Sequence, residues 1–220
     1  MFLIRQPEFL IREFSSSDFE QLLHIAHAIN VQAKNKEGFQ PFYAFQADPA
    51  EQDYHELLQD KIKTFLKTAQ DEKSKTPRKT YRLALCDNAG QLIGNITIDN
   101  LPSYDDKGNK IQGDIGYFIN PQHGRKGLMS KALRSVLHIY FKNHDELDVT
   151  VHPMNLYSIK MLQRFNAKVI GIKSTSTYQN EPRIVFKISK ENFLNSCKPF
   201  LITTQKNQPS LNRDEREKNV

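Results

Sequence analysis

Residues 113–133 read GDIGYFINPQHGRKGLMSKAL, and this stretch restricts the fold more than any other part of the chain. The segment DIGYFI predicts a strand, and the apolar residues after Gly127 recur at the spacing of an amphipathic helix. Between strand and helix stand Gly124, Arg125, Lys126 and Gly127. A plain connection needs fewer glycines and no paired cations, so this turn calls for an explanation beyond chain reversal.

The remaining segments extend this unit to a complete domain. Apolar spacing predicts strands at 9–14, 80–87, 91–99, 147–152, 167–172 and 183–188, and helices at 15–30, 48–65, 128–140 and 155–165. This order predicts an α+β fold with one mixed central sheet of about six to seven strands and helices on both faces. We expect a single domain over residues 1–190 and a polar, partly disordered C-terminal tail over residues 191–220.

Two of the predicted helices carry capping signals at their starts. Ser17 and Glu20 have the spacing of a capping box before the first helix. For the second helix, Asp48 is the predicted N-cap, Pro49 the first helical residue, and Glu51 the partner in the box.

Charge and composition exclude several classes of protein. The formal net charge of +6 favours an anionic partner, but the cations are scattered and match no recognised nucleic-acid-binding motif, so a basic nucleic-acid-binding module is kept only as an alternative. No apolar run reaches the roughly 18 residues that cross a bilayer. Two distant cysteines argue against a disulfide framework, and the histidines lack the spacing of a metal site. We therefore expect a cytoplasmic protein without a membrane partner or a metal.

The basic glycine turn has the properties of an anion site. The first amides of a helix have no intrahelical partner, and the helix dipole places positive charge there. Gly124 and Gly127 allow the backbone to approach a ligand closely, and Arg125 and Lys126 would add charge-assisted hydrogen bonds. Amides of residues 125–130 would suit the two phosphates of a diphosphate. The alternative is a surface turn whose cations are simply solvated.

Three pieces of the sequence, in order, resemble the GNAT acetyltransferases, especially the branch that acetylates ribosomal-protein N-termini. DIGYFI is similar to the strand before the family's acetyl-CoA loop, and GRKGLMSKAL is similar to that loop and its helix. NLYSIKMLQRFNAKVIG resembles the family's Asn-x-x-Ser helix. The likeness covers roughly residues 9–190, and it implies a single GNAT-like domain.

The resemblance implies that acetyl-CoA is a co-substrate and that the chain is an N-acetyltransferase. An amine, either a protein N-terminus or a small molecule, would attack the thioester directly in a ternary complex. A homodimer is left open as an assembly. The residues implied in cofactor binding are Gly124, Arg125, Lys126, Gly127, Leu128, Met129 and Ser130 at the diphosphate, and Tyr117, Phe118, Ile119 and Asn155 along the pantetheine arm. A backbone amide near Phe118 or Ile119 would stabilise the oxyanion.

Two residues are implied in catalysis. Asp114 stands where the family often has an acidic residue, and we expect it to be the general base; capping of the loop or pairing with a lysine is an equal alternative. Ser158 would protonate the leaving thiolate, with Tyr157 or water as alternatives. Asn155 is also a good helix N-cap, which alone would explain its presence.

Several positions depart from the family pattern or carry two interpretations. Met129 stands where the family loop has a small residue, and Leu162 stands where a tyrosine often acts as general acid. These departures keep open a further alternative, a non-catalytic CoA-binding relative or a scaffold for a partner. Asn166 replaces a glycine at the helix end and is expected in the left-handed conformation. The aromatic residues of the loop 39–45 form either a wall of the acceptor cleft or part of the core; they are Phe39, Phe42, Tyr43 and Phe45.

Overall fold

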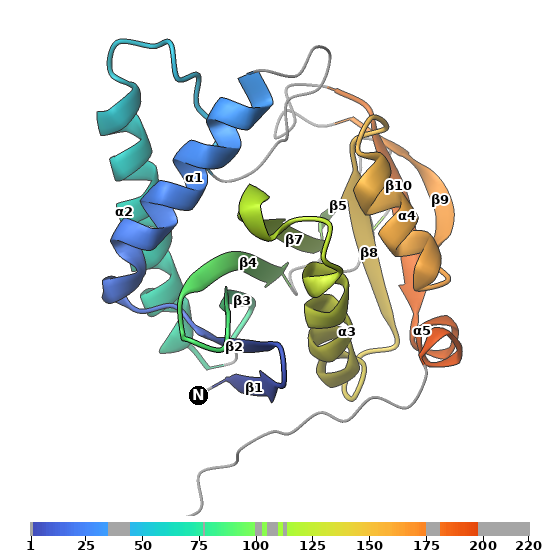
Figure 1. Ribbon diagram of the computed structural model, residues 1–220. Helices are drawn as coiled ribbons and strands as arrows, with labels where there is room; N and C mark the ends of the chain where they lie inside the picture. Colours follow the sequence, from blue (N-terminus) through green and yellow to red (C-terminus); the bar gives the residue numbers. More distant parts are fainter. Residues whose placement is uncertain are drawn as a thin grey trace, which may run out of the picture.

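The computed structural model describes residues 2–34, 45–76, 78–99, 103–104, 110–111, 114–174 and 181–197, and it confirms the α+β fold (Figure 1). Its larger sheet has the order β1-β2-β3-β4-β7, and its smaller sheet has the order β8-β10-β9. The strands of the larger sheet are β1 (Leu3–Gln6), β2 (Phe9–Glu13), β3 (Thr80–Cys86), β4 (Leu92–Asp99) and β7 (Asp114–Ile119). Those of the smaller sheet are β8 (Glu146–Val151), β9 (Lys168–Lys173) and β10 (Arg183–Ser189). A short pair, β5 (Ser103–Tyr104) and β6 (Lys110–Ile111), stands apart from both.

The single central sheet predicted from the sequence is divided between β7 and β8. Each pairing within the two larger sheets is antiparallel, and β7 and β8 are the edge strands that face each other. The two strands are joined where the Asp114 carboxylate accepts hydrogen bonds from Thr150, at 3.2 Å from Oγ1 and 3.4 Å from the amide nitrogen. Beyond this point they form no common ladder, so the fold presents two strand edges to each other.

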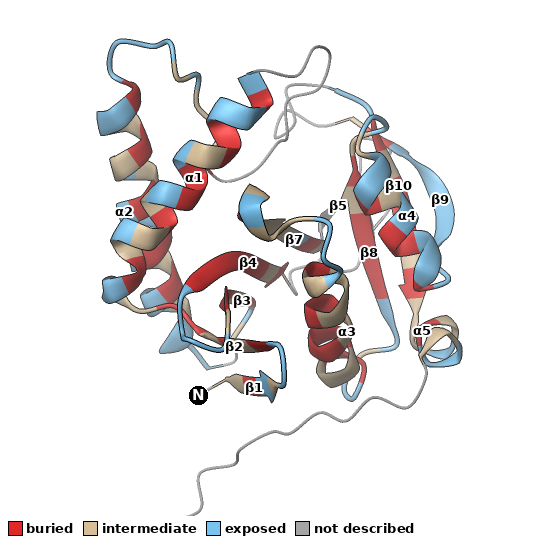
Figure 2. Cartoon of the chain, in the orientation of Figure 1, coloured by how far each residue is buried: buried red, intermediate tan, exposed pale blue. Residues whose placement is uncertain are grey.

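The larger sheet is covered on both faces, as the sequence predicts. Strand β3 shows the alternation: Leu83 and Leu85 pack toward α3, whereas Ala84 and Cys86 pack toward α1 and α2. Figure 1 shows α1 and α2 together on one side, and Figure 2 shows that their buried residues lie along the inner side. The helices are α1 (Phe19–Lys34), α2 (Tyr54–Lys73), α3 (Leu128–Tyr140), α4 (Leu156–Arg164) and α5 (Lys190–Ser196).

Both predicted helix starts are displaced in the structure. The capping interaction before α1 uses Ser15, whose amide donates to the Asp18 carboxylate at 2.8 Å, rather than Ser17 and Glu20. Arg12 fixes Asp18 further with two hydrogen bonds of 2.6 and 2.7 Å. Helix α2 starts only at Tyr54, because the residues after Asp48 form successive turns instead of helix.

Asp48 caps one of these turns. Its carboxylate accepts a hydrogen bond from the Ala50 amide at 2.9 Å and pairs with Lys34 at 3.1 Å. The N-cap signal therefore acts on a turn that carries the chain from α1 toward α2.

The chain remains folded past residue 190, where the expected tail begins. Ser189 caps α5 by accepting a hydrogen bond from the Asn192 amide at 3.2 Å. Phe193 of this helix is fully buried against Phe141 and Phe165, with ring centroids 5.2 and 5.9 Å apart. The polar composition of this segment did not predict helix α5, which packs on the core through the buried side chain of Phe193. Residues 198–220 lie outside the described part of the chain.

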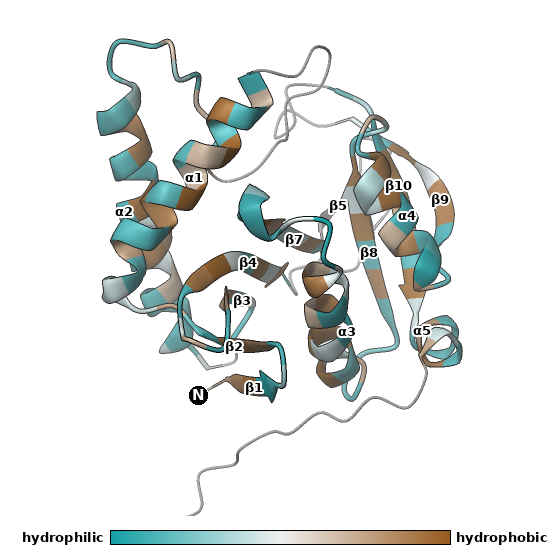
Figure 3. Cartoon of the chain, in the orientation of Figure 1, coloured by the Kyte–Doolittle hydropathy of each residue, from teal (hydrophilic) through white to brown (hydrophobic). Residues whose placement is uncertain are grey.

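Strand β9 forms the outer edge of the smaller sheet and contributes little to the core. Its Val169, Ile170 and Ile172 are exposed, which makes this strand hydrophobic yet open to solvent (Figures 2 and 3). The packing of this sheet against α3 and α4 depends instead on the inner residues of β8 and β10.

Candidate active site

The loop between β7 and α3 is rigidly built. The Asn120 amide donates to the Ile93 carbonyl at 2.7 Å, and its side chain accepts from the Gln122 amide at 3.1 Å. These bonds define a 3₁₀ turn, Pro121–His123, which the sequence did not predict. The next residues adopt left-handed backbone conformations at Arg125 (φ 62°) and Gly127 (φ 75°). Because a left-handed arginine is strained, the surrounding contacts must hold this loop in place, as is common at functional sites.

This loop ends in a run of free amides. The first helical backbone bond joins the Lys131 amide to the Gly127 carbonyl at 3.1 Å. Across the described residues, no acceptor pairs with the amides of residues 125–130. Arg125, Lys126 and Gly127 are exposed beside them. Free amides at a helix start beside exposed cations are suited to bind an anion.

Met129 does not crowd this site. Its side chain is only 9% exposed and packs in the main core, so the residue offers its amide to the loop and its side chain to the interior. Leu128 packs partly against the same core. At Gly127, a Cβ would meet no atom within 4 Å, which leaves open space in front of the free amides. The large side chain at residue 129 therefore packs in the core and leaves the loop accessible.

Strand β7 directs its three predicted cofactor-lining residues to two different sides. Tyr117 and Ile119 pack partly against the core beside α3, whereas Phe118 packs on the side of α1 and α2, 5.8 Å from the Phe45 ring. β4 approaches this end of β7 so closely at Gly94 that a Cβ there would lie 2.5 Å from the Phe118 carbonyl oxygen. The edge of β7 that faces β8 belongs to no strand ladder among the described residues.

Asp114 lies where the two sheets meet. Its carboxylate accepts hydrogen bonds from Thr150 and, at 2.8 Å, from the Ile115 amide. Burial raises the pKa of Asp114, although these hydrogen bonds and the charge of Lys173 oppose the rise. A carboxyl with a raised pKa is better matched to proton transfer near neutral pH than an ordinary one. The geometry also gives Asp114 a structural role, since it joins β7 to β8.

Asn155 and Ser158 stand together at the start of α4. The Asn155 side chain accepts a hydrogen bond from the Ser158 amide at 3.2 Å, which is the ordinary N-cap role. Ser158 is only 8% exposed and lies beside the hydroxyl of Tyr117. The structure thus brings two hydroxyl groups together between β7 and α4, near Asp114.

The Tyr117 hydroxyl is the feature of this site that sequence reasoning missed. Its oxygen is buried and makes no hydrogen bond of normal geometry within the described chain. Burial raises the pKa of Tyr117 to about 12, with Asp114 adding to the rise and Ser158 opposing it. A hydrophobic strand pattern predicts the ring but carries no information about the hydroxyl.

The other candidate acids lie elsewhere. Tyr157 is 68% exposed, and the Arg125 guanidinium stands over its ring at 5.8 Å from the centroid. Leu162 is buried in the core and leaves the family's usual acid position apolar. At the end of α4, Asn166 has φ 55°, which confirms the predicted left-handed conformation.

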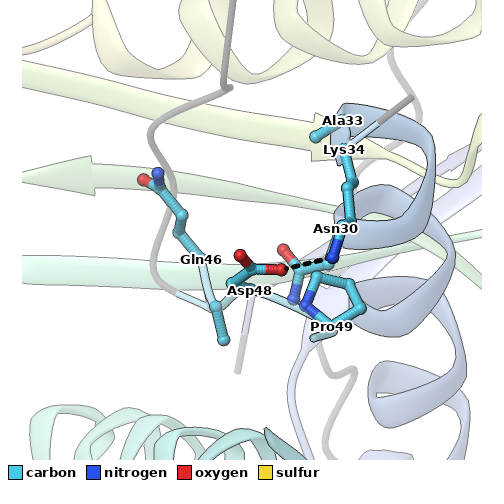
Figure 4. A pocket seen from close by; sticks show the side chains of 7 residues that line it. Asn30, Ala33, Lys34, Gln46, Asp48 and Pro49 are labelled. Carbon is cyan, nitrogen blue, oxygen red and sulfur yellow. Dashed lines mark hydrogen bonds and ion pairs between the residues drawn. The ribbon is translucent and has the colours of Figure 1, made fainter. Parts of the chain in front are cut away.

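The predicted aromatic wall falls largely on residues outside the described ranges, namely Phe39, Phe42 and Tyr43. Phe45 is fully buried, with its ring 5.0 Å from that of Phe65, so it belongs to the core. A nearby pocket has a cavity volume of about 10 Å³, no more than one water needs (Figure 4). It is crossed by the Lys34–Asp48 ion pair, and its lining is Asn30, Ala33, Lys34, Gln46, Ala47, Asp48 and Pro49.

The described residues contain neither a metal-binding cluster nor a helix that could span a membrane. No group of three or more His, Cys, Asp or Glu side chains is arranged to hold a metal ion among them. None of their helices is both long and apolar enough to cross a membrane.

Comparison with known proteins identifies the fold. The sequence pattern of the acetyltransferase (GNAT) domain matches residues 8–168. No curated protein matches the chain.

Several solved structures resemble the chain at low sequence identity. The ribosomal-protein-S5-alanine acetyltransferase of Vibrio fischeri is 16% identical; the match covers 90% of this chain and all of that one, with a TM-score of 0.64. Mycobacterium smegmatis RimJ, solved with CoA-disulfide, is 15% identical over 86% of this chain and 87% of its own, with a TM-score of 0.63. The microcin C7 self-immunity acetyltransferase MccE, solved with acetyl-CoA and AMP, is 13% identical over 84% and 93%, with a TM-score of 0.59. These likenesses concern the fold.

Proposed function

The chain belongs to the GNAT acetyltransferase family, and on this premise we propose that it transfers an acetyl group from acetyl-CoA to a primary amine in the cytoplasm. The observation that carries the proposal is the run of free amides at residues 125–130 beside two exposed cations. Solved structures of the same fold that contain CoA or acetyl-CoA support acetyl-CoA as the co-substrate.

The proposed binding mode places the diphosphate of acetyl-CoA on this loop. Amides of residues 125–130 donate to its oxygens, and Arg125 and Lys126 add charge-assisted bonds. The pantetheine arm then runs along the edge of β7 that faces β8, where it can pair with the backbone like an added strand. Asn155 stands beside this path, at the start of α4.

Direct attack by the amine follows from this arrangement. Alignment of two bound reactants can contribute about 7–11 kcal/mol to the acceleration, so positioning supplies most of the catalysis. A backbone amide near Phe118 or Ile119 stabilises the negative charge that develops on the carbonyl oxygen. Asp114 takes the proton of the attacking amine, and Ser158 assists the leaving thiolate.

The acceptor amine is best matched by an α-amine. Deprotonating a lysine of pKa about 10.4 costs about 4.6 kcal/mol at pH 7, whereas an α-amine of pKa about 7.8 costs about 1 kcal/mol. A single buried carboxyl such as Asp114 can meet the smaller demand. We therefore rank a protein N-terminus above a lysine side chain, with a small amine as the other acceptor class.

Calorimetric titration with CoA tests the binding mode. Replacing both Arg125 and Lys126 by alanine should raise Kd at least tenfold, because each charge-assisted hydrogen bond contributes about 1.5–3 kcal/mol. The matched control is Lys142→Ala, which removes an exposed cation just past the other end of α3. An equal loss in the control, or none in the double variant, would place the diphosphate elsewhere.

Thiol release tests the reaction. We would compare a peptide with a free N-terminus against the same peptide with a blocked N-terminus and a free lysine. The proposal predicts faster release with the α-amine at pH 7. Equal rates of thiol release with and without an acceptor peptide would contradict transfer to an amine. Salt-sensitive binding to random DNA without affinity for CoA would instead support a nucleic-acid-binding module.

A further inference from the structure

We propose that Tyr117 is a catalytic residue whose hydroxyl donates a hydrogen bond to the leaving sulfur of acetyl-CoA, next to Ser158. The inference rests on the proposed acetyl transfer and names a residue for which the sequence predicted only a lining role. It is based on the burial of the hydroxyl, on its neighbours, and on the protonation state that this environment imposes.

The hydroxyl is buried beside the Ser158 side chain. Its oxygen makes no hydrogen bond of normal geometry to any described residue. A buried polar group in this state costs folding free energy, and most buried hydroxyls in proteins are paired. Phenylalanine would fill the same space, since the ring packs partly against the core. Packing alone therefore does not explain the hydroxyl, and we ascribe to it a role in the reaction.

The neighbours of the hydroxyl point to that use. Tyr117 lies three residues past Asp114 on β7, the strand along which the coenzyme arm is proposed to run. Its hydroxyl lies beside Ser158 in the first turn of α4. The other hydroxyl near Asp114, on Thr150, already donates to that carboxylate. Tyr117 and Ser158 thus carry the other two hydroxyls at this place.

The protonation state decides what this donor can do. Burial raises the pKa of Tyr117 to about 12, so the phenol stays protonated throughout the neutral range. A thiol has a pKa of about 8.5, well below this value. The phenol therefore keeps its proton and stabilises the thiolate by a hydrogen bond.

The electron and proton balance follows from the acetyl transfer. The amine nitrogen forms a bond to the carbonyl carbon, and its proton passes to the Asp114 carboxylate. The carbon–sulfur bond then breaks with its electron pair on sulfur. The thiolate is held by the Tyr117 and Ser158 hydroxyls until it leaves as an anion or takes a proton from solvent.

The variant Tyr117→Phe tests the role by kinetics and stability together. We expect kcat to fall ten- to a hundredfold, with the Kd for CoA changed less than threefold. The melting temperature should stay the same or rise, because a buried unpaired hydroxyl is removed. A structural role would predict the reverse: lower stability with little change in kcat per folded molecule. Tyr81→Phe is the matched control: this ring also packs partly against the core, but it lies on β3, which β4 separates from β7, so the variant should change neither kcat nor the Kd for CoA.

A second measurement follows the sulfur itself and does not depend on a variant. The ultraviolet absorbance of the thiolate reports the ionisation of CoA bound to the wild-type protein. We expect its ionisation constant to be at least tenfold larger than that of free CoA, and to return toward the free value in Tyr117→Phe. An unchanged ionisation constant in the wild type, or full kcat in Tyr117→Phe, would overturn the inference. If the wild type neither binds CoA nor releases thiol, the proposed function itself fails.

Discussion

Gly127 offers a test of the anion site that separates charge from shape. Its φ of 75° is unfavourable for most side chains, but asparagine and aspartate tolerate this region better than others. A Cβ at this position meets no atom within 4 Å, so both residues fit. Gly127→Asn and Gly127→Asp therefore differ in one negative charge at nearly constant shape and backbone strain.

The size of the effect follows from Coulomb's law. A carboxylate about 5 Å from a diphosphate with about two charges is repelled by about 1.7 kcal/mol in water, and by several times more at an effective dielectric constant near 20. The first value corresponds to a Kd roughly 15-fold higher for the Asp variant than for the Asn variant. Without ligand the order reverses, because a negative charge at a helix N-terminus stabilises by about 0.3–1 kcal/mol.

Calorimetry and thermal unfolding measure the two quantities on the same samples. We expect the Asp variant to melt at or above the Asn variant in the absence of CoA, and to bind CoA at least tenfold more weakly. The difference in Kd should shrink at high salt, where the charges are screened. Equal affinities for CoA in the two variants would refute a diphosphate at this helix end. A lower melting temperature of the Asp variant without ligand would refute the electrostatic part of the reasoning.

Three further predictions concern β7 and its surroundings. Asp114→Asn should lower kcat but raise the free energy of unfolding at about pH 7. The reason is that a carboxyl with a raised pKa contributes stability that is lost as pH rises through that pKa, and asparagine does not ionise. The gain in stability, measured by denaturant titration, should vanish near pH 4. Gly94→Ala should cost about 1–3 kcal/mol of stability by urea unfolding, since its Cβ would meet the Phe118 carbonyl at 2.5 Å; a neutral effect would mean that β4 can move. Asn166→Ala should lower stability by about 1 kcal/mol, whereas Asn166→Gly should not, because the φ of 55° penalises a Cβ; equal melting temperatures of the two variants would argue against this.

Local patterns in the sequence predicted most of the elements that build the site. Alternation in β3 and β7 predicted strands, and the spacing after Gly127 predicted α3. The free amides and exposed cations of the loop before α3 were predictable too, because they follow from where a helix begins. The same local logic placed Asn166 in the left-handed region.

Features that depend on contacts between distant segments were not predictable. The division of the sheet depends on how β7 and β8 separate after Asp114, and no local pattern records this. Helix α2 starts at Tyr54 instead of near Asp48, where the carboxylate caps a turn and pairs with Lys34 at the end of α1. The Tyr117 hydroxyl gained its significance only from burial beside α4, since the sequence shows a tyrosine in a strand and nothing about its partners.

Amide resonances of residues 125–130 provide the most direct test of the central claim that these groups bind a diphosphate. We would record them by NMR during titration with CoA and, separately, with pantetheine, which lacks the diphosphate. The account predicts that the resonances of residues 125–130 move and saturate with CoA but stay in place with pantetheine. Resonances that remain fixed while CoA shifts those of another surface would contradict it.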